Sequence, residues 1–151
     1  MAYRRPESVL VVVYTRAGDV LALRRCRPFD FWQSVTGALE AGETPAETAT
    51  RELFEETGID AGEQLIATGT KRVFVIDPRW RDRYAPGVTE NTEWEFRLEL
   101  QDRCPIALDP REHSEYAWLS ADRAIERFWS WTNKDAIREL VNACEYLQVA
   151  T

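Results

Sequence analysis

Short apolar runs separated by turn residues recur along the chain and predict β-strands. The run Ser8–Tyr14 is rich in β-branched residues, and Val20–Arg24 follows it after the turn sequence ArgAlaGlyAsp. Two such runs joined by a short turn are typical of a hairpin of buried strands. Further strands are predicted at Trp32–Val35, Leu65–Ile76, Glu93–Leu100 and Tyr116–Leu119.

One helix has clear start and stop signals. Thr44 is a suitable N-cap, a proline follows it at the first helical position, and Glu47 stands where a capping box needs an acid. Gly58 can close the C-terminus in a left-handed conformation. These signals predict a helix over Pro45–Thr57. Its core-facing stripe consists of Ala46, Ala49 and Leu53.

Two more helices are predicted near the C-terminus. Ser120 is an N-cap candidate for a helix beginning AlaAspArgAla, and a final helix is expected from about Asn133 to Leu147. Strands and helices alternate in a mixed order, which is typical of an α/β domain with helices packed on a sheet. We expect residues 1–151 to form a single domain, because this length supports one core but not two.

Composition and charge narrow the possible functions. With 44% hydrophobic and 30% charged residues the chain is typical of a globular protein. Its formal net charge of -7 argues against binding to a nucleic-acid polymer, which needs a basic face. A small triphosphate remains a possible substrate, because metal ions and local arginines can neutralise its charge.

The cysteines and the apolar segments indicate in which cellular compartment the protein is expected. Cys26, Cys104 and Cys144 are widely spaced and form no CxxC motif, so the sequence predicts neither a disulfide framework nor a thiolate zinc site. No apolar run has the length of a membrane-spanning helix, and the first one is too short for a signal-peptide core. We therefore expect a cytoplasmic protein without a membrane partner.

Three glutamates of the helix predicted over residues 45–57 form the main chemical signal. Glu52, Glu55 and Glu56 stand at positions i, i+3 and i+4, so their side chains share one helical face. Like charges so close are most easily tolerated when an oxygen-seeking cation such as Mg²⁺ or Mn²⁺ neutralises them. The plainer alternative is a solvated acidic face. A metal site would indicate phosphoryl or pyrophosphoryl chemistry.

The segment GALEAGETPAETATRELFEETGI, residues 37–59, resembles the signature of the Nudix hydrolases, Gx5Ex7REUxEExGU, where U is aliphatic. The signature is filled by Gly37, Glu43, Arg51, Glu52, Leu53, Glu55, Glu56, Gly58 and Ile59. The resemblance implies the Nudix fold, an α/β/α sandwich around a mixed β-sheet.

The signature residues have expected roles. Arg51 and Glu43 can pair and fix how the helix meets the loop before it, and Gly37 and Gly58 are expected to supply unusual backbone conformations at its ends. By resemblance, Glu52 and Glu56 are metal ligands, and Glu55 is a further ligand or the base. The base that deprotonates the attacking water is Glu52 or Glu55, and the sequence does not choose between them.

Three other segments, FWQSVTG, RYAPGVTENTE and SWTN, look like the bacterial Nudix branch that hydrolyses dihydroneopterin triphosphate and is also described as a dATP pyrophosphohydrolase. The same resemblance proposes Glu112 as a metal ligand from a distant loop, with Glu115 as second choice. A solvated surface acid is the plainer interpretation of either residue. His113, the only histidine, is expected at the surface and receives no role.

Five residues are predicted to bind substrate. Arg24, at a strand end, can contact phosphate, and resemblance supports the same role for Arg4. Thr36 can donate to a substrate oxygen, although turn hydroxyls often bond their own backbone. Phe74 can stack on a heterocycle, and Ser130 can contact one. Tyr84, Trp129, Trp131 and Asn133 are further candidates for the ring pocket, whereas Trp32, Trp94 and Trp118 are expected to pack in the core.

Together these features predict a Mg²⁺-dependent pyrophosphohydrolase, with Mn²⁺ as an alternative ion. Its expected reaction converts dihydroneopterin triphosphate into the monophosphate and pyrophosphate in folate biosynthesis. A first alternative is a nucleotide pyrophosphohydrolase acting on dATP or a modified purine nucleotide, because purines and pterins share fused nitrogen rings. A second is a non-catalytic Nudix-fold module that binds nucleotides. The protein is expected to be a monomer or a homodimer.

Overall fold

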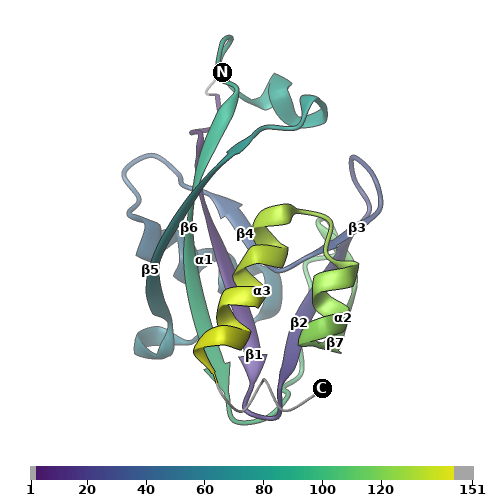
Figure 1. Cartoon of the computed structure of the whole chain (residues 1–151). Helices are drawn as coiled ribbons and strands as arrows, with labels where there is room; N and C mark the ends of the chain where they lie inside the picture. Colours follow the sequence, from purple (N-terminus) through teal and green to yellow (C-terminus); the bar gives the residue numbers. More distant parts are fainter. Residues whose placement is uncertain (1–2, 145–151) are drawn as a thin grey trace.

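A computed structural model describes residues 3–144, which form one mixed β-sheet with helices on both faces (Figure 1). Its strands are β1 (Glu7–Thr15), β2 (Asp19–Arg25), β3 (Phe31–Gln33), β4 (Val35–Ala38), β5 (Ile66–Val75), β6 (Glu90–Leu100) and β7 (His113–Ser120). Its helices are α1 (Pro45–Thr57), α2 (Ala121–Arg127) and α3 (Trp131–Ala143), with short 3-10 helices η1 (Gly62–Gln64) and η2 (Pro78–Arg83) in two loops.

The sheet divides along one edge of β1. On its other edge β1 pairs in parallel with β6, and β5 follows β6 in antiparallel orientation. Two antiparallel strands share the dividing edge: β4 pairs with Ser8–Val11, whereas β2 pairs at Tyr14. β2 continues the sheet with β3 and β7. This division separates β4 from β2 at the end of the sheet where the candidate site lies.

Alternation along β1 supplies a core on each face of the sheet. Leu10 and Val12 face α2 and α3, where they pack with Phe128 and Ile137. On the opposite face, Val9, Val11 and Val13 pack with Ala49 and Leu53 of α1. Figure 1 shows α3 and α2 in front of the sheet and α1 behind it. The predicted α/β/α sandwich around a mixed sheet is confirmed.

Helix α1 begins and ends where the sequence predicts. The side chain of Thr44 accepts a hydrogen bond from the backbone N–H of Glu47, and the Glu47 side chain accepts from the N–H of Thr44, so the capping box is complete. Gly58 ends the helix with φ of 79°, the left-handed region that glycine tolerates best.

Two element predictions were wrong. The single strand expected over Trp32–Val35 is two strands, because the chain leaves β2 at Ser34 and then pairs with β1. The final helix, predicted from about Asn133, starts two residues earlier at Trp131, because Ser130 is its N-cap. Asn133 instead accepts a hydrogen bond from the backbone N–H of Ser34 at 2.8 Å. The part of that prediction reaching Leu147 lies outside the described residues.

Within residues 3–144, no helix is both long enough and apolar enough to cross a membrane.

Candidate active site

A cavity of about 420 Å³ lies where the sheet divides. Its walls are the N-terminal end of α3, strands β3 and β4, and the ends of β5 and β6 that are joined by η2. Charged and polar side chains line it, among them Arg4, Arg25, Gln33, Thr36, Glu52, Asn91, Glu93, Glu112 and Asn133. Aromatic side chains also line it, namely Phe31, Phe74, Trp80, Tyr84, Trp129 and Trp131.

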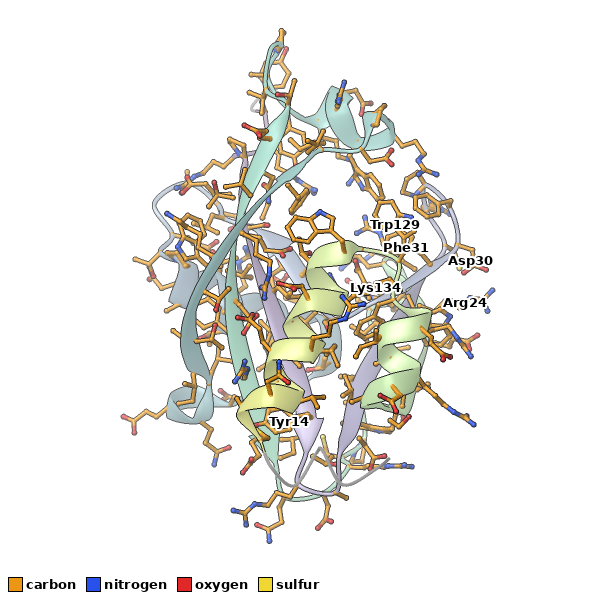
Figure 2. All side chains as sticks on the ribbon, in the orientation of Figure 1. Tyr14, Arg24, Asp30, Phe31, Trp129 and Lys134 are labelled. Atoms are coloured by element: carbon orange, nitrogen blue, oxygen red, sulfur yellow. The ribbon has the colours of Figure 1, made fainter. Side chains whose placement is uncertain are left out.

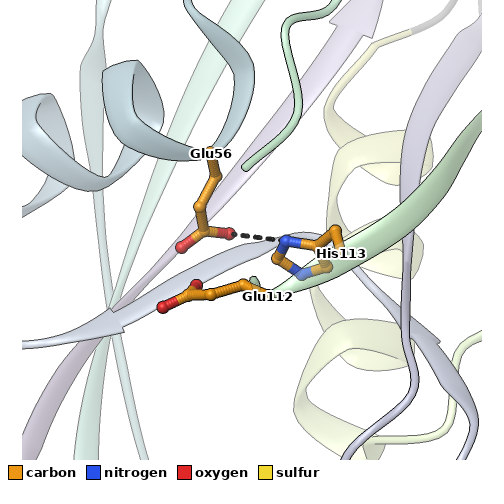
Figure 3. A group of neighbouring side chains, drawn as sticks. All are labelled: Glu56, Glu112 and His113. Atoms are coloured by element: carbon orange, nitrogen blue, oxygen red, sulfur yellow. Dashed lines mark ion pairs between the residues drawn. The ribbon is translucent and has the colours of Figure 1, made fainter. Parts of the chain in front are cut away.

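Three potential metal ligands meet beside this cavity. Glu56 of α1, Glu112 of the loop before β7 and His113 of β7 have ligand atoms within 4.8 Å of one another (Figure 3). In the figure the Glu112 carboxylate lies below that of Glu56, and a dashed line joins Glu56 to the imidazole of His113 at its right. A loop acid distant in sequence thus joins the glutamates of α1, as expected for Glu112.

Glu56 is the best-placed of these groups for a cation. Its side chain is 2% exposed, and neither carboxylate oxygen has a hydrogen-bond partner among the described residues. Burial raises the pKa of Glu56 well above 4.5, and the neighbouring Glu52 and Glu112 raise it further. A divalent cation would compensate for both the burial and the repulsion. The residues present therefore fit a divalent metal ion.

His113 is buried, not at the surface as the sequence suggested. Its Nε2 lies 3.0 Å from Nε2 of Gln33, and the Oε1 of that glutamine lies 3.5 Å from the hydroxyl of Thr36. With this assignment the glutamine amide donates to Nε2, so the imidazole proton is on Nδ1, which lies 3.9 Å from Oε1 of Glu56. Burial, with help from Arg25, lowers the pKa of His113 to about 4, so the ring is neutral at pH 7.

Arg51 binds the acids of α1 and the preceding loop together. It donates to both carboxylate oxygens of Glu43, at 2.7 and 2.9 Å, and to Glu52 at 2.5 Å. A longer contact of 3.3 Å reaches Glu55. The hydrogen bonds from Arg51 lower the pKa of Glu43 to about 2. The expected pairing of Arg51 with Glu43 is present.

Gly37 matters because of space, not because of its backbone conformation. Among the described glycines with positive φ, Gly58 is present but Gly37 is not, so the expectation of an unusual backbone was wrong at position 37. A Cβ at Gly37 would lie 2.2 Å from Cδ of Glu52. The missing side chain therefore leaves the room that the Glu52 carboxyl occupies beside the cavity.

The remaining two glutamates differ in exposure. The Glu52 side chain is 11% exposed and lines the cavity, whereas the Glu55 side chain is 52% exposed and does not line it. Of the three glutamates predicted to share a helical face, Glu55 is therefore exposed, whereas Glu52 and Glu56 are buried.

The structure separates the two adjacent arginines of β2. Arg24 lies outside the cavity and pairs with Asp30 at 2.5 Å and with Glu115 at 2.8 Å, at the periphery of the molecule (Figure 2). Arg25 lines the cavity. An irregularity in the pairing of β2 with β7 falls between these arginines and sets Arg25 opposite His113. The placement therefore does not support phosphate contact by Arg24 or a metal role for Glu115.

Aromatic rings form one wall of the cavity. Trp129 packs against Phe31 and Trp80, with ring centroids 5.4 and 5.7 Å apart, and Figure 2 shows Phe31 beside Trp129. Phe74 and Ser130 also line the cavity, as do Arg4 and Thr36, so four of the five residues predicted to contact substrate surround it. A flat heterocycle fits such surroundings.

Besides naming Arg24 in place of Arg25, sequence reasoning missed four polar residues of the site, Gln33, Asn91, Glu93 and His113. All four are buried. For Asn91 and Glu93 a signal was available, because both stand on the same face of a strand whose other face is apolar. Two polar residues on a covered strand face indicate a binding site or a buried network.

The sequence is similar to those of known proteins. The family model of the NUDIX domain matches residues 4–140. The chain is 46% identical over 143 residues to the dihydroneopterin triphosphate diphosphatase of Escherichia coli (strain K12), covering 92% of this chain and 94% of that protein. The Haemophilus influenzae enzyme of the same name is 41% identical over 143 residues, covering 92% and 89%.

A solved structure of a protein with a similar sequence has the same fold as this chain. The structure of the E. coli dihydroneopterin triphosphate pyrophosphohydrolase superposes with a TM-score of 0.88 at 44% identity. The alignment covers 95% of this chain and 100% of that one, so the similarity in fold extends over nearly the whole of both chains.

Proposed function

The chain belongs to the Nudix family, and from this premise we propose that it is a hydrolase that converts dihydroneopterin triphosphate into the monophosphate and pyrophosphate. The observation that carries the proposal is the buried Glu56 carboxylate, whose oxygens have no partner among residues 3–144 and which lies beside Glu52 and Glu112 at a cavity that also contains arginines. A binding module would not need buried, clustered carboxylates.

We assign the metal ligands to Glu52, Glu56 and Glu112. Carboxylate oxygens are the ligands that Mg²⁺ prefers, and Mn²⁺ is the alternative ion. The bound cation would neutralise phosphate charge and lower the pKa of a water molecule. His113 is not assigned as a ligand, because its Nδ1 carries the proton and its Nε2 accepts a hydrogen bond from Gln33.

Other side chains hold the triphosphate and move the proton. Arg25 and Arg4 line the cavity and supply positive charge for phosphate oxygens. Thr36 stands on β4 next to Gly37 and can donate its hydroxyl to a substrate oxygen. The proton of the attacking water goes to Glu52 or Glu55, both of which Arg51 holds by hydrogen bonds.

The pterin substrate is proposed from the relatives and from the cavity. Phe74 and the Trp129 cluster offer flat apolar surfaces to a heterocycle, and Ser130 offers a hydroxyl. On this basis the enzyme would act in folate biosynthesis. Its location is predicted to be cytoplasmic, and residues 1–151 are predicted to form one catalytic domain, as monomer or homodimer.

The test is pyrophosphate release with and without Mg²⁺, with dihydroneopterin triphosphate and dATP compared at equal low concentrations. We expect release only with the metal ion, and faster release from the pterin. Faster release from dATP by tenfold or more would assign the enzyme to nucleotide metabolism. No release from any triphosphate, together with tight binding, would favour a binding module.

A further inference from the structure

Glu93 is a buried acid that the chemistry described so far does not use. It lies in the middle of the polar face of β6, is 4% exposed and lines the cavity. Across the sheet it stands opposite Ser8 of β1 and Arg72 of β5, and Thr132 and Asn133 of α3 lie on the same face. Asn91, two residues before Glu93, is paired with Phe74 of β5, and Thr132 lies two residues after Ser130, so Glu93 is near two residues that are proposed to contact the heterocycle.

The Glu93 carboxylate has an acceptor atom that the described protein does not satisfy. Its Oε1 is buried and has no hydrogen-bond partner among residues 3–144. Asn91, two residues earlier on the same strand face, donates its amide to Ser8 at 2.7 Å, and its Oδ1 also has no partner there. Burying hydrogen-bond acceptors without donors costs free energy. A ligand whose N–H groups donate to these two oxygens would therefore be bound favourably.

Nearby charges do not neutralise Glu93. Arg72 stands opposite, but it donates to Glu95 and Asp135 at 2.8 Å each and also to Glu139. Burial raises the pKa of Glu93 to about 7, against the opposing effects of Thr132 and Arg72 and with a smaller contribution from Glu95. Burial of an acid that no neighbouring charge neutralises costs stability.

We propose that Glu93 determines which heterocycle the enzyme accepts, by receiving two N–H groups from a 2-amino-4-oxo ring edge on its carboxylate. This inference rests on the proposed function, which places the ring near Phe74 and Ser130. A 2-amino-4-oxopteridine presents N3–H and the 2-amino group side by side, which matches the two oxygens of a carboxylate.

The same geometry discriminates against adenine. The corresponding adenine edge has one donor, the 6-amino group, beside an acceptor, N1, and N1 is repelled by the ionised carboxylate that predominates above pH 7. Guanine shares the amino-oxo edge and its two donors. Glu93 therefore selects an amino-oxo ring rather than one ring system, and sites that require a hydrogen-bond donor reject analogues lacking it strongly.

The test is Glu93→Gln, which keeps the shape but replaces one acceptor by a donor. In the metal-loaded enzyme, assayed at a pH well above 7 so that Glu93 is ionised, we expect kcat/KM for dihydroneopterin triphosphate to fall by about 10- to 100-fold. With dATP it should stay constant or rise, because the amide can donate to N1 and accept from the 6-amino group. Glu90→Gln, the same change at an exposed position of β6, is the matched control and should leave both values unchanged.

A second measurement separates this inference from the proposed function. Binding of dihydroneopterin and of adenosine, neither carrying phosphate, is compared in the wild type and the variant by titration. If the wild type hydrolyses no triphosphate but Glu93→Gln still weakens dihydroneopterin selectively, the hydrolase proposal fails and the role of Glu93 stands. Equal effects on the pterin and the adenine compound, in turnover or in binding, would overturn it, and thermal melting confirms that the variant is folded.

Discussion

The carboxyl group of Glu52 occupies the space that a side chain at position 37 would need. A Cβ built on Gly37 lies 2.2 Å from Cδ and 2.6 Å from Oε2 of Glu52. Strand β4 passes so close to α1 that only a residue without a side chain at position 37 leaves room for Glu52. Gly37 therefore allows this proposed metal ligand to take its observed position.

Gly37→Ala should damage activity more than folding. The added methyl group must push the Glu52 carboxyl aside, and the end of a glutamate side chain moves at little cost. We expect a fall in kcat by about 10- to 100-fold, in the range found when a charge-stabilising group is lost. The Mg²⁺ concentration for half-maximal rate should rise. The measurements are kcat as a function of Mg²⁺ and the thermal unfolding midpoint.

Gly42→Ala is the matched control in the loop between β4 and α1. A Cβ there meets nothing within 4 Å, but φ is +79°, so the substitution costs backbone strain of about 1 kcal/mol. In contrast to Gly37→Ala, this substitution should lower the stability of the protein and leave the activity per folded molecule unchanged. A Gly37→Ala enzyme with full activity and the wild-type metal requirement would contradict the role given to that contact.

Glu56→Gln tests the metal site directly. The substitution keeps the shape of a buried side chain whose pKa is already raised by burial, so the metal-free protein should be as stable as the wild type or more stable. Turnover should fall by about a hundredfold or more, because a ligand charge is lost. The increase in melting temperature that Mg²⁺ gives the wild type should disappear. Glu63→Gln, at an exposed site, serves as control.

The arginines of β2 should differ in their effect on substrate binding. Arg25→Ala removes a cation that lines the cavity, so we expect the KM for a triphosphate to rise by about tenfold or more, as for a lost charged hydrogen bond. Arg24→Ala breaks only peripheral pairs with Asp30 and Glu115 and should leave KM unchanged. Steady-state kinetics on both variants measure these KM values. A larger rise in KM for Arg24→Ala than for Arg25→Ala would support the sequence prediction that Arg24 contacts phosphate.

Local signals in the sequence were sufficient for the helix over residues 45–57. Its cap, its proline and its closing glycine act within a few residues, so α1 begins and ends as predicted. The pairing of Arg51 with Glu43 was predictable for the same reason, since both belong to one loop and helix.

Features that depend on pairing between distant strands were not predictable in this way. Which of Arg24 and Arg25 faces the cavity depends on the irregular register between β2 and β7. The burial of His113 depends on contact with Gln33, eighty residues earlier. Glu93 resembles any polar residue of a half-exposed strand until α3 covers it. One sequence contains no direct record of these contacts.

Glu43 links the acid stability of the fold to the signature. Its carboxylate accepts from Arg51, from the backbone N–H of Glu40 and from the hydroxyl of Thr48, and its side chain is 17% exposed. The hydrogen bond from Arg51 is the main reason that its pKa falls from 4.5 to about 2. The native state therefore favours the ionised form.

The sign of the pH effect follows from that lowered pKa. A carboxylate with a lower pKa in the folded state stabilises the protein above pH 4.5, and this contribution is lost progressively as the pH falls towards about 2. Glu43→Gln should thus lower the free energy of unfolding by roughly 1–2 kcal/mol at pH 7, after allowance for solvent screening. At pH 3 the wild type and the variant should differ by less. Urea unfolding at both pH values measures the difference, and a gap of equal size at pH 3 and pH 7 would show that Glu43 stabilises the fold through its shape and not through its charge.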